Sequence, residues 1–293
     1  MLKNYIKEFM AEALHEECDD EKADEEFINY MNMGYFVLEN DNKIVCQAEL
    51  GRKMKHGKCI SCVYTPKEER GKSYAYNLVY RISKELLDFL QKSPTAFHAV
   101  ENIKEELNKQ GFVELLEGQP WKMVPGGKYY VTRNNSSIIA LKVGSNSENY
   151  SFNVAASHSD CPTFKLKENA ELEVKGKYTQ LNTEGYGGMI CSTWFDKPLS
   201  IAGRLLIKDG NELKTQLINI DRDLVLIPNV AIHMNRAVND GYAYNKQIDM
   251  LPLFGGADCK PGDFKKLVAK EAGVSVEDIY GSDLYLYNRT APS

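Results

Sequence analysis

His158 and Asp160 stand two residues apart in the segment FNVAASHSDCPTFKLK, residues 152–167. A metal-ligating imidazole needs an acceptor, commonly a carboxylate, for its second ring nitrogen, and many zinc hydrolases place the two side chains at this spacing. On an extended backbone, residues of one parity point to the same side, so these two side chains would emerge together. The pair indicates a metal ligand with its orienting carboxylate; for an isolated pair, a hydrogen-bonded structural histidine is the alternative.

The elements before this pair are predicted to be a helix followed by strands. A helix is expected to start at Ser93 and Pro94 and to stop at Gly111. The runs KYYVTR, SIIALKVG and YSFNVAASH then alternate with turn residues, which is typical of β-strands. The last of these runs would carry the His–Asp pair at its end.

The first 90 residues show a different pattern. Apolar residues at helical spacing predict two helices within residues 1–32. From Gly34 the runs YFVLE, IVCQAEL and KCISCVYT predict an antiparallel meander. The loop PKEERGKS leads into YAYNLVYRISKELLDFL, whose apolar residues form one helical stripe.

Cys59 and Cys62 form a CxxC motif, and His56 precedes Cys59 at the same spacing. Zinc or a redox dithiol is one interpretation. In a strand, however, positions i and i+3 point to opposite faces, which favours buried or edge cysteines. Seven cysteines, an odd number, indicate reduced thiols rather than a disulfide framework.

Composition excludes several classes of function. The chain has 36 Lys and Arg against 41 Asp and Glu, with no basic block to neutralise phosphates, so no nucleic-acid partner is expected. No run reaches the roughly 18 apolar residues of a membrane span, and the N-terminal residues carry too many charges for a secretory signal. We therefore expect no membrane association and a cytoplasmic location.

The segment VYTPKEERGKSYAYNLVYRISKELL, with the strands before it, resembles the coenzyme-binding motif of GNAT acetyltransferases over about residues 34–90. Backbone N–H groups at a helix start can cradle a pyrophosphate. The resemblance implies acetyl-CoA contacts from Arg70, Gly71, Lys72, Ser73 and Tyr74. Ser73 stands where the motif usually has glycine, and the family's later strand and helix have no counterpart here, so a scaffold without transfer activity is the alternative.

Five ordered motifs carry a second resemblance: LLDFLQKSPTAFHAVENIKEELNKQGFVEL, WKMVPGGKYYVTRNNSSIIALKVG, AASHSDCPTFKLK, YGGMICSTWFDKPLSIAGRL and LVLIPNVAIHMNR. Over about residues 85–293 they resemble the aspartyl aminopeptidase family of two-zinc exopeptidases. The resemblance implies an α/β (mixed α+β) fold, in which a β-rich insertion interrupts the catalytic domain and mediates homo-oligomer assembly. It also implies removal of acidic N-terminal residues from peptides.

Residue by residue, the resemblance makes His158 the first zinc ligand and Asp160 the catalytic carboxylate that orients it. His233, in NVAIHMNR, matches a histidine that binds substrate in a neighbouring subunit's active site; a structural role is equally open. Asp196 is interpreted as structural or close to the substrate, and His98 as a residue of a helix start.

Four segments are expected from the two resemblances. They are a partial GNAT-like segment (1–84), the N-terminal part of an incomplete catalytic domain (85–164), the β-rich dimerisation domain (165–275) and a return strand (276–293). The family's bridging aspartate, Glu–Glu pair and other ligands follow the insertion and have no match here, so we expect at most weak zinc binding and no peptide hydrolysis by this chain alone. The alternatives are an acetyl-CoA-binding module and a non-catalytic assembly module for intact aminopeptidase subunits.

Overall fold

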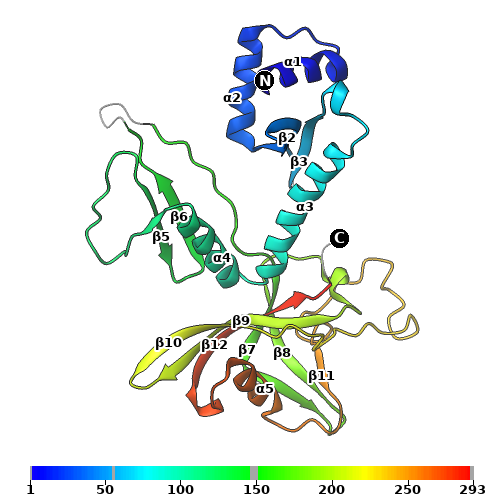
Figure 1. The fold of residues 1–293 in the computed structure, drawn as a ribbon. Coiled ribbons are helices and arrows are strands. Elements are labelled where there is room, and N and C mark those ends of the chain that lie inside the picture. The colour runs from blue at the N-terminus through cyan, green and yellow to red at the C-terminus, as the bar shows by residue number, and fades with distance from the viewer. Residues whose placement is uncertain (1, 55–56, 146–150, 291–293) are drawn as a thin grey trace. The chain divides into compact units, whose positions relative to one another are not determined.

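The structure, a computed structural model, describes residues 2–54, 57–145 and 151–290 (Figure 1). The chain divides into two compact units, Met1–Asp88 and Phe89–Ser293, near the boundary expected at 84/85. Both units combine helices with sheets, which confirms the mixed α/β class. Within the described ranges, every helix is too short or too polar to cross a bilayer.

The first unit contains the two N-terminal helices, the meander and the long helix that the sequence predicts. Its elements are α1 (Leu2–Phe9), continued by a π-helical turn (Met10–Leu14), α2 (Asp20–Met33), β1 (Tyr35–Asn40), β2 (Lys43–Met54), β3 (Gly57–Tyr64) and most of α3 (Tyr74–Lys92). The three strands pair antiparallel in the order β1-β2-β3. Asp41 and Asn42 both have positive φ, as a two-residue hairpin turn requires.

The central strand of the first unit's sheet, β2, is buried on both faces. Cys46 and Ala48 of β2 pack against Leu78 and Ile82 of α3, because alternate residues of a strand share a face. The opposite parity carries Gln47, which is fully buried and accepts a hydrogen bond of 2.5 Å from Tyr35. A second apolar cluster joins α1 to α2 through Ile6, Met10 and Tyr30.

The second unit begins with a helix and a small sheet. Its elements are α4 (Ala96–Lys109), β4 (Val113–Glu114), β5 (Lys128–Arg133) and β6 (Ser137–Lys142). β4 runs parallel to β5, and β5 pairs antiparallel with β6. The turn between β5 and β6 contains Asn134 and Asn135 with φ of 54° and 48°, a left-handed conformation that asparagine tolerates better than most residues. The helix and both longer strands confirm the sequence prediction.

The prediction of a strand immediately before His158 is wrong for the residues that the structure describes. Residues 151–157 form neither helix nor strand, and Phe152 and Val154 expose 82% and 83% of their surface. An alternating pattern forms a strand only where a neighbouring strand pairs with it, and within the described part of the chain no strand pairs with residues 151–157. The His–Asp pair therefore follows an irregular segment.

A six-stranded sheet forms the core of the second unit. It is built from β7 (Thr163–Val174), β8 (Tyr178–Tyr186), β9 (Leu199–Asp209), β10 (Glu212–Asn219), β11 (Leu253–Gly255) and β12 (Ile279–Asn288), in the order β10-β9-β12-β7-β8-β11. α5 (Asp263–Ala272) adds Phe264 and Val268 to the apolar cluster of this sheet. Glu171 of β7 accepts hydrogen bonds from the N–H groups of Gly262 and Phe264, and so satisfies the start of α5.

β12 is an interior strand of this sheet. It pairs antiparallel with both β9 and β7, and Figure 1 shows it in red between strands coloured green to yellow. Residues 276–293, expected to return from the β-rich domain to the catalytic domain, thus include a central strand of the β-rich sheet. The expected domain end at 275 would divide this sheet.

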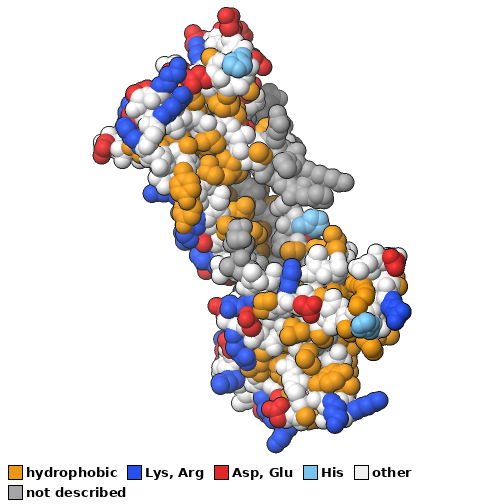
Figure 2. Space-filling view, turned by 90° about the vertical axis from the view of Figure 1, so that its right-hand side faces the viewer, with side chains coloured by type: hydrophobic (Ala, Val, Ile, Leu, Met, Phe, Trp, Pro, Cys, Tyr) orange, Lys and Arg blue, Asp and Glu red, His pale blue; other side chains and the backbone are white. Residues whose placement is uncertain are grey.

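Hydrophobic side chains also lie at the surface of both units, interspersed with charged ones (Figure 2). The largest exposed fractions of apolar side chains belong to Val154, Phe152, Met234, Ile190, Tyr76 and Ile248. Tyr76 and Tyr80 of α3 stack with their ring centroids 6.2 Å apart.

Candidate functional site

His158 and Asp160 line a cavity of about 800 Å³ in the second unit. Its wall combines the start of α4, the β5–β6 turn, the loop 157–162 and residues of β8, β9 and β12. Ser159 donates a hydrogen bond of 2.8 Å to the carbonyl oxygen of Ser136, which ties the loop to the β5–β6 turn. The loop is held on its other side by Thr163, whose hydroxyl donates to the carbonyl oxygen of Leu286.

Three side chains form a chain of hydrogen bonds at the edge of this cavity. His158 Nδ1 lies 3.0 Å from Asp160 Oδ1, and the hydroxyl of Tyr186 donates to Asp160 Oδ2 over 2.5 Å. The side chain of His158 is 91% exposed, whereas that of Asp160 is 33% exposed. The structure thus brings together the predicted pair and adds a tyrosine that sequence reasoning missed.

The protonation states follow from these contacts. Hydrogen bonds from Tyr186, and then from His158, lower the pKa of Asp160, so this carboxyl is ionised at neutral pH. The same hydrogen bond raises the pKa of Tyr186, which keeps its proton. An ionised carboxylate only accepts hydrogen bonds, so Nδ1 of His158 must donate. The lone pair of the neutral imidazole is then on Nε2, which is the atom available to a metal.

The pair fits the donor chemistry of one zinc ligand with its orienting carboxylate. Catalytic zinc sites use about three protein ligands, however. Among the residues that the structure describes, no group of three or more His, Cys, Asp or Glu side chains is placed to hold a metal ion. The described residues therefore supply one ligand position and do not make a zinc centre by themselves.

Asp283 forms a charged cluster on another wall of the cavity. Its carboxylate binds Lys165 Nζ at 2.7 Å and Arg204 Nη2 at 2.8 Å. The Arg204 guanidinium also donates to Asn134 and lies 4.2 Å from the ring centroid of Phe97. Burial raises the pKa of Asp283, but the hydrogen bonds from Lys165 and Arg204 outweigh it, and the pKa is lowered.

Replacing Asp283 with asparagine is expected to destabilise the second unit by about 2 kcal/mol at pH 7, because it removes hydrogen bonds between charged groups. The folded-state pKa of Asp283 lies below its ordinary value. Its stabilisation is therefore complete above about pH 4 and is lost as the pH falls through the lower folded-state pKa. Thermal melts from pH 7 to pH 2 should show the gap between wild type and D283N closing below pH 4. A gap independent of pH would contradict this account.

The other histidines and the remaining aspartate singled out in the sequence lie elsewhere. His233 is exposed in an irregular segment and does not line the cavity. Asp196 has φ of 56° and accepts a hydrogen bond of 2.9 Å from the N–H group of Asn229, which is a structural contact. His98 lies at the start of α4 with Nδ1 2.8 Å from the hydroxyl of Thr95, and burial lowers its pKa.

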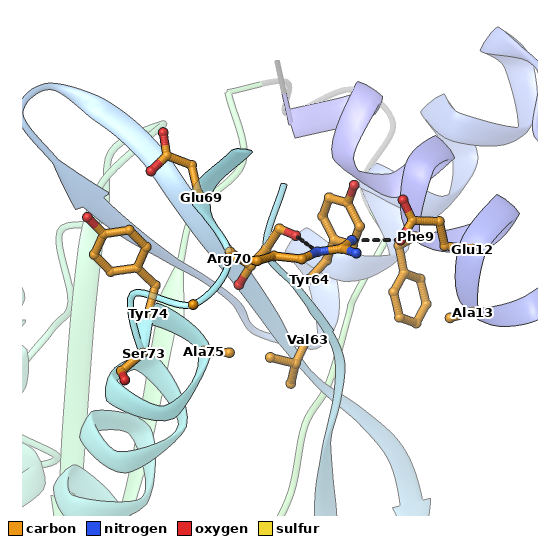
Figure 3. A pocket seen from close by; sticks show the side chains of 12 residues that line it. Phe9, Glu12, Ala13, Val63, Tyr64, Glu69, Arg70, Ser73, Tyr74 and Ala75 are labelled. Atoms are coloured by element: carbon orange, nitrogen blue, oxygen red, sulfur yellow. Dashed lines mark hydrogen bonds and ion pairs between the residues drawn. The ribbon is translucent and has the colours of Figure 1, made fainter. Parts of the chain in front are cut away.

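A second cavity, of about 600 Å³, lies in the first unit (Figure 3). The predicted acetyl-CoA contacts Arg70, Gly71, Ser73 and Tyr74 line it, and Lys72 does not. Gly71 and Ser73 have φ of 79° and 59°, so Ser73 adopts the left-handed conformation that glycine favours. Residues of α1 and the π-helical turn form the facing wall.

The cations of this loop are already paired with carboxylates. Arg70 donates to Glu12 over 2.6 Å, drawn as a dashed line in Figure 3, and to the carbonyl oxygen of Thr65 over 2.9 Å. Lys72 binds Glu69 at 2.7 Å. Glu12 and Glu69 line the cavity, so an entering phosphate would meet two carboxylates as well as one guanidinium. Backbone N–H groups at the start of α3 and the hydroxyl of Ser73 are further donors that an anion could use there.

The two cysteines of the CxxC motif lie on β3 and do not meet at one site. Cys59 donates to its neighbour's carbonyl oxygen at Ile60, whereas Cys62 accepts from the hydroxyl of Tyr30 at 3.2 Å. Burial raises the pKa of the Cys62 thiol to about 11, which disfavours the thiolate. His56, the third member of that motif, lies outside the described residues.

The fold of the second unit is that of solved aminopeptidase-class structures. Chaetomium thermophilum mApe1 is similar with a TM-score of 0.63 and 32% identity, over 72% of this chain and 51% of that one. The S. cerevisiae mApe1 dodecamer is similar with a TM-score of 0.57 and 27% identity, over 72% of this chain and 48% of that one. The second unit thus shares the fold of about half of each of these solved chains.

The comparisons of sequence agree with the likeness to these solved structures. The model of the family described as "Aminopeptidase I zinc metalloprotease (M18)" matches residues 89–292. A probable M18 family aminopeptidase 2 of Clostridium novyi is 46% identical over 213 residues, 71% of this chain and 49% of the relative. The chain belongs to the M18 family. It spans about half the length of the curated relatives that it matches.

Proposed function

We propose that the second unit works as the His158-bearing part of a zinc aminopeptidase. The observation that carries the proposal is the hydrogen-bonded His158–Asp160 pair at a cavity, in a segment that matches the M18 family. One ligand is too few for a zinc ion. We therefore propose that the other ligands and the general base come from residues outside those described, in keeping with a relative of which the match covers only 49%.

The roles of this chain's own residues follow from the geometry. Asp160 holds the Nδ1 proton of His158 and so fixes which nitrogen is presented to a metal. Ser159, tied to Ser136, limits the movement of the loop that carries the imidazole. When bound, zinc would polarise the scissile carbonyl and lower the pKa of an attacking water.

Substrate and assembly are further parts of the proposal. We assign peptides with acidic N-terminal residues as substrates on the resemblance to aspartyl aminopeptidases, with His233 as a substrate-binding residue of a neighbouring subunit. We assign homo-oligomerisation to the β-rich sheet of residues 163–290 rather than 165–275, because β12 belongs to it. The solved S. cerevisiae mApe1, a structural neighbour, is a dodecamer, which supports assembly.

The test joins this chain to the portion of the Clostridium novyi relative that it does not cover. With zinc, the fusion is expected to release N-terminal aspartate from a peptide faster than N-terminal leucine, and a chelator should stop the release. Light scattering on the same fusion tests assembly. A folded fusion without zinc-dependent release would exclude the proposed activity, equal rates would exclude the acidic preference, and a monomer would exclude homo-oligomerisation.

A second candidate function concerns the first unit. We propose that its cavity binds acetyl-CoA without transferring the acetyl group, because four of the five residues expected to contact this cofactor line one cavity. At a ligand concentration a hundredfold above Kd, binding would add about 2.7 kcal/mol of stability. We therefore expect acetyl-CoA to raise the melting temperature by several degrees.

The matched control for acetyl-CoA binding is Ser73→Asp. Ser73 is exposed at the position before α3, where aspartate also caps a helix well, so the fold should persist. The added carboxylate would repel the phosphates. The acetyl-CoA shift should disappear in S73D, and an equal shift in both proteins would place the ligand elsewhere.

A further inference from the structure

Tyr186 contacts the predicted metal-ligand pair from a distant part of the sequence. Its hydroxyl donates to Asp160 Oδ2 over 2.5 Å, while the other oxygen of this carboxylate faces His158 Nδ1 at 3.0 Å. The two oxygens of the Asp160 carboxylate thus accept hydrogen bonds from two different side chains, Tyr186 and His158. Asp160 cannot rotate to leave the imidazole without also breaking the hydrogen bond from Tyr186.

The six-stranded sheet fixes the position of Tyr186. Tyr186 is the last residue of β8, and its register partner is Thr163, the first residue of β7. The loop with His158 and Asp160 leads directly into Thr163, so the register of two strands brings the hydroxyl to the carboxylate. Beyond Tyr186, Gly187 turns the chain away with φ of 74°.

The ring of Tyr186 is supported from a third strand. It packs edge to face against Tyr285 of β12, with the ring centroids 5.7 Å apart. Tyr285 pairs with Ala202 of β9 and with Lys165 of β7, so it belongs to the interior of the sheet. His158, by contrast, is 91% exposed on a loop and has little packing of its own to orient it.

We infer that Tyr186 is a positioning residue, which acts through Asp160 to hold the His158 imidazole in the tautomer with its proton on Nδ1 and its lone pair on Nε2. The use of this tautomer in binding a metal rests on the proposed function. The tautomer itself is a property of this chain and can be measured without a metal. The outer partners of metal-ligating histidines commonly change metal affinity by about 10- to 100-fold when they are removed. Through Tyr186, the β-rich sheet would set the geometry of a ligand that lies outside it.

The test is nitrogen-15 NMR of the histidine-labelled full chain, without metal. The chain has five histidines, and the signal of His158 is identified as the one that is missing from a His158→Gln variant. Wild-type His158 is expected to show predominantly the Nδ1–H tautomer. In Tyr186→Phe the fraction of the Nε2–H tautomer should rise several-fold, and in Asp160→Asn the wild-type preference should be lost.

The matched control is Tyr285→Phe, which removes a hydroxyl from the neighbouring ring and leaves the contact with Asp160 in place. It should keep the wild-type tautomer ratio. A wild-type ratio in folded Y186F would overturn the inference, and so would an equal change in Y285F.

A second measurement does not depend on the folding of Y186F. The carbon-13 chemical shift of the Tyr186 ring carbon that bears the hydroxyl reports the hydrogen bonding of this group and should change in D160N. An unchanged shift would also overturn the inference. Neither readout requires peptide hydrolysis. Failure of the proposed activity and failure of this positioning role are therefore distinguishable.

Discussion

Replacing His158 with alanine in the fusion with the Clostridium novyi relative is expected to lower kcat/KM by about 10³-fold, because a bound zinc contributes several kcal/mol of charge stabilisation and each 1.36 kcal/mol is a factor of ten. Zinc bound per chain, measured by mass spectrometry, should fall at the same time. The fold should persist, because the side chain is 91% exposed and contacts mainly Asp160.

The control for this variant is His15→Asn. His15 lies in the first unit with φ of 57°, a conformation that asparagine tolerates, and so its replacement removes one imidazole at little structural cost. It should leave both kcat/KM and zinc content unchanged. If H158A kept more than a tenth of the activity, His158 would not be a zinc ligand.

The largest effect on stability is expected for Gly203→Ala. Gly203 of β9 pairs with Leu284 of β12, and a Cβ atom at this glycine would overlap the carbonyl oxygen of Asp283 and lie 2.9 Å from its carbonyl carbon. The neighbouring backbone can yield only by separating two interior strands. We expect a loss of about 3 kcal/mol, which for a unit of about 200 residues lowers the melting temperature by roughly 10 °C.

Gly281→Ala provides the comparison within the same strand pair. The nearest atom to a Cβ at Gly281 is Leu206 Cβ at 3.9 Å, which is ordinary van der Waals contact. Its melting temperature should stay close to wild type. Equal losses in both variants would point to a general intolerance of side chains in β12 and β9 rather than to the close approach at Gly203.

Elements with strong local signals were predictable from sequence. α3 and α4 carry apolar stripes at helical spacing, and the β1–β2 and β5–β6 hairpins carry Asn and Asp at turn positions. These signals depend on neighbours within a few residues. They need no knowledge of what the element packs against.

The site was predictable only in part, because only some of its contacts join residues that are close in sequence. His158 and Asp160 are close in sequence, so their spacing was enough to predict that they interact. The contact of Tyr186 with Asp160 depends on the register of β8 against β7, 26 residues further along the chain. The strand expected at 151–157 failed because its pattern presumed a neighbour. Long-range pairing is the information that a single sequence does not contain in readable form.

The interior position of β12 also affects the order in which the sheet can form during protein synthesis. During synthesis, the β7–β8 and β9–β10 hairpins are complete once residue 219 has left the ribosome, but the strand that joins them ends only at residue 288. At about 5 to 20 residues per second, the 69 residues from 219 to 288 take roughly 3.5 to 14 s to synthesise, and for that time the nascent chain exposes both inner strand edges. Over that interval two unjoined hairpins would be open to wrong partners, so this half of the molecule should depend on chaperones more than its size alone would require.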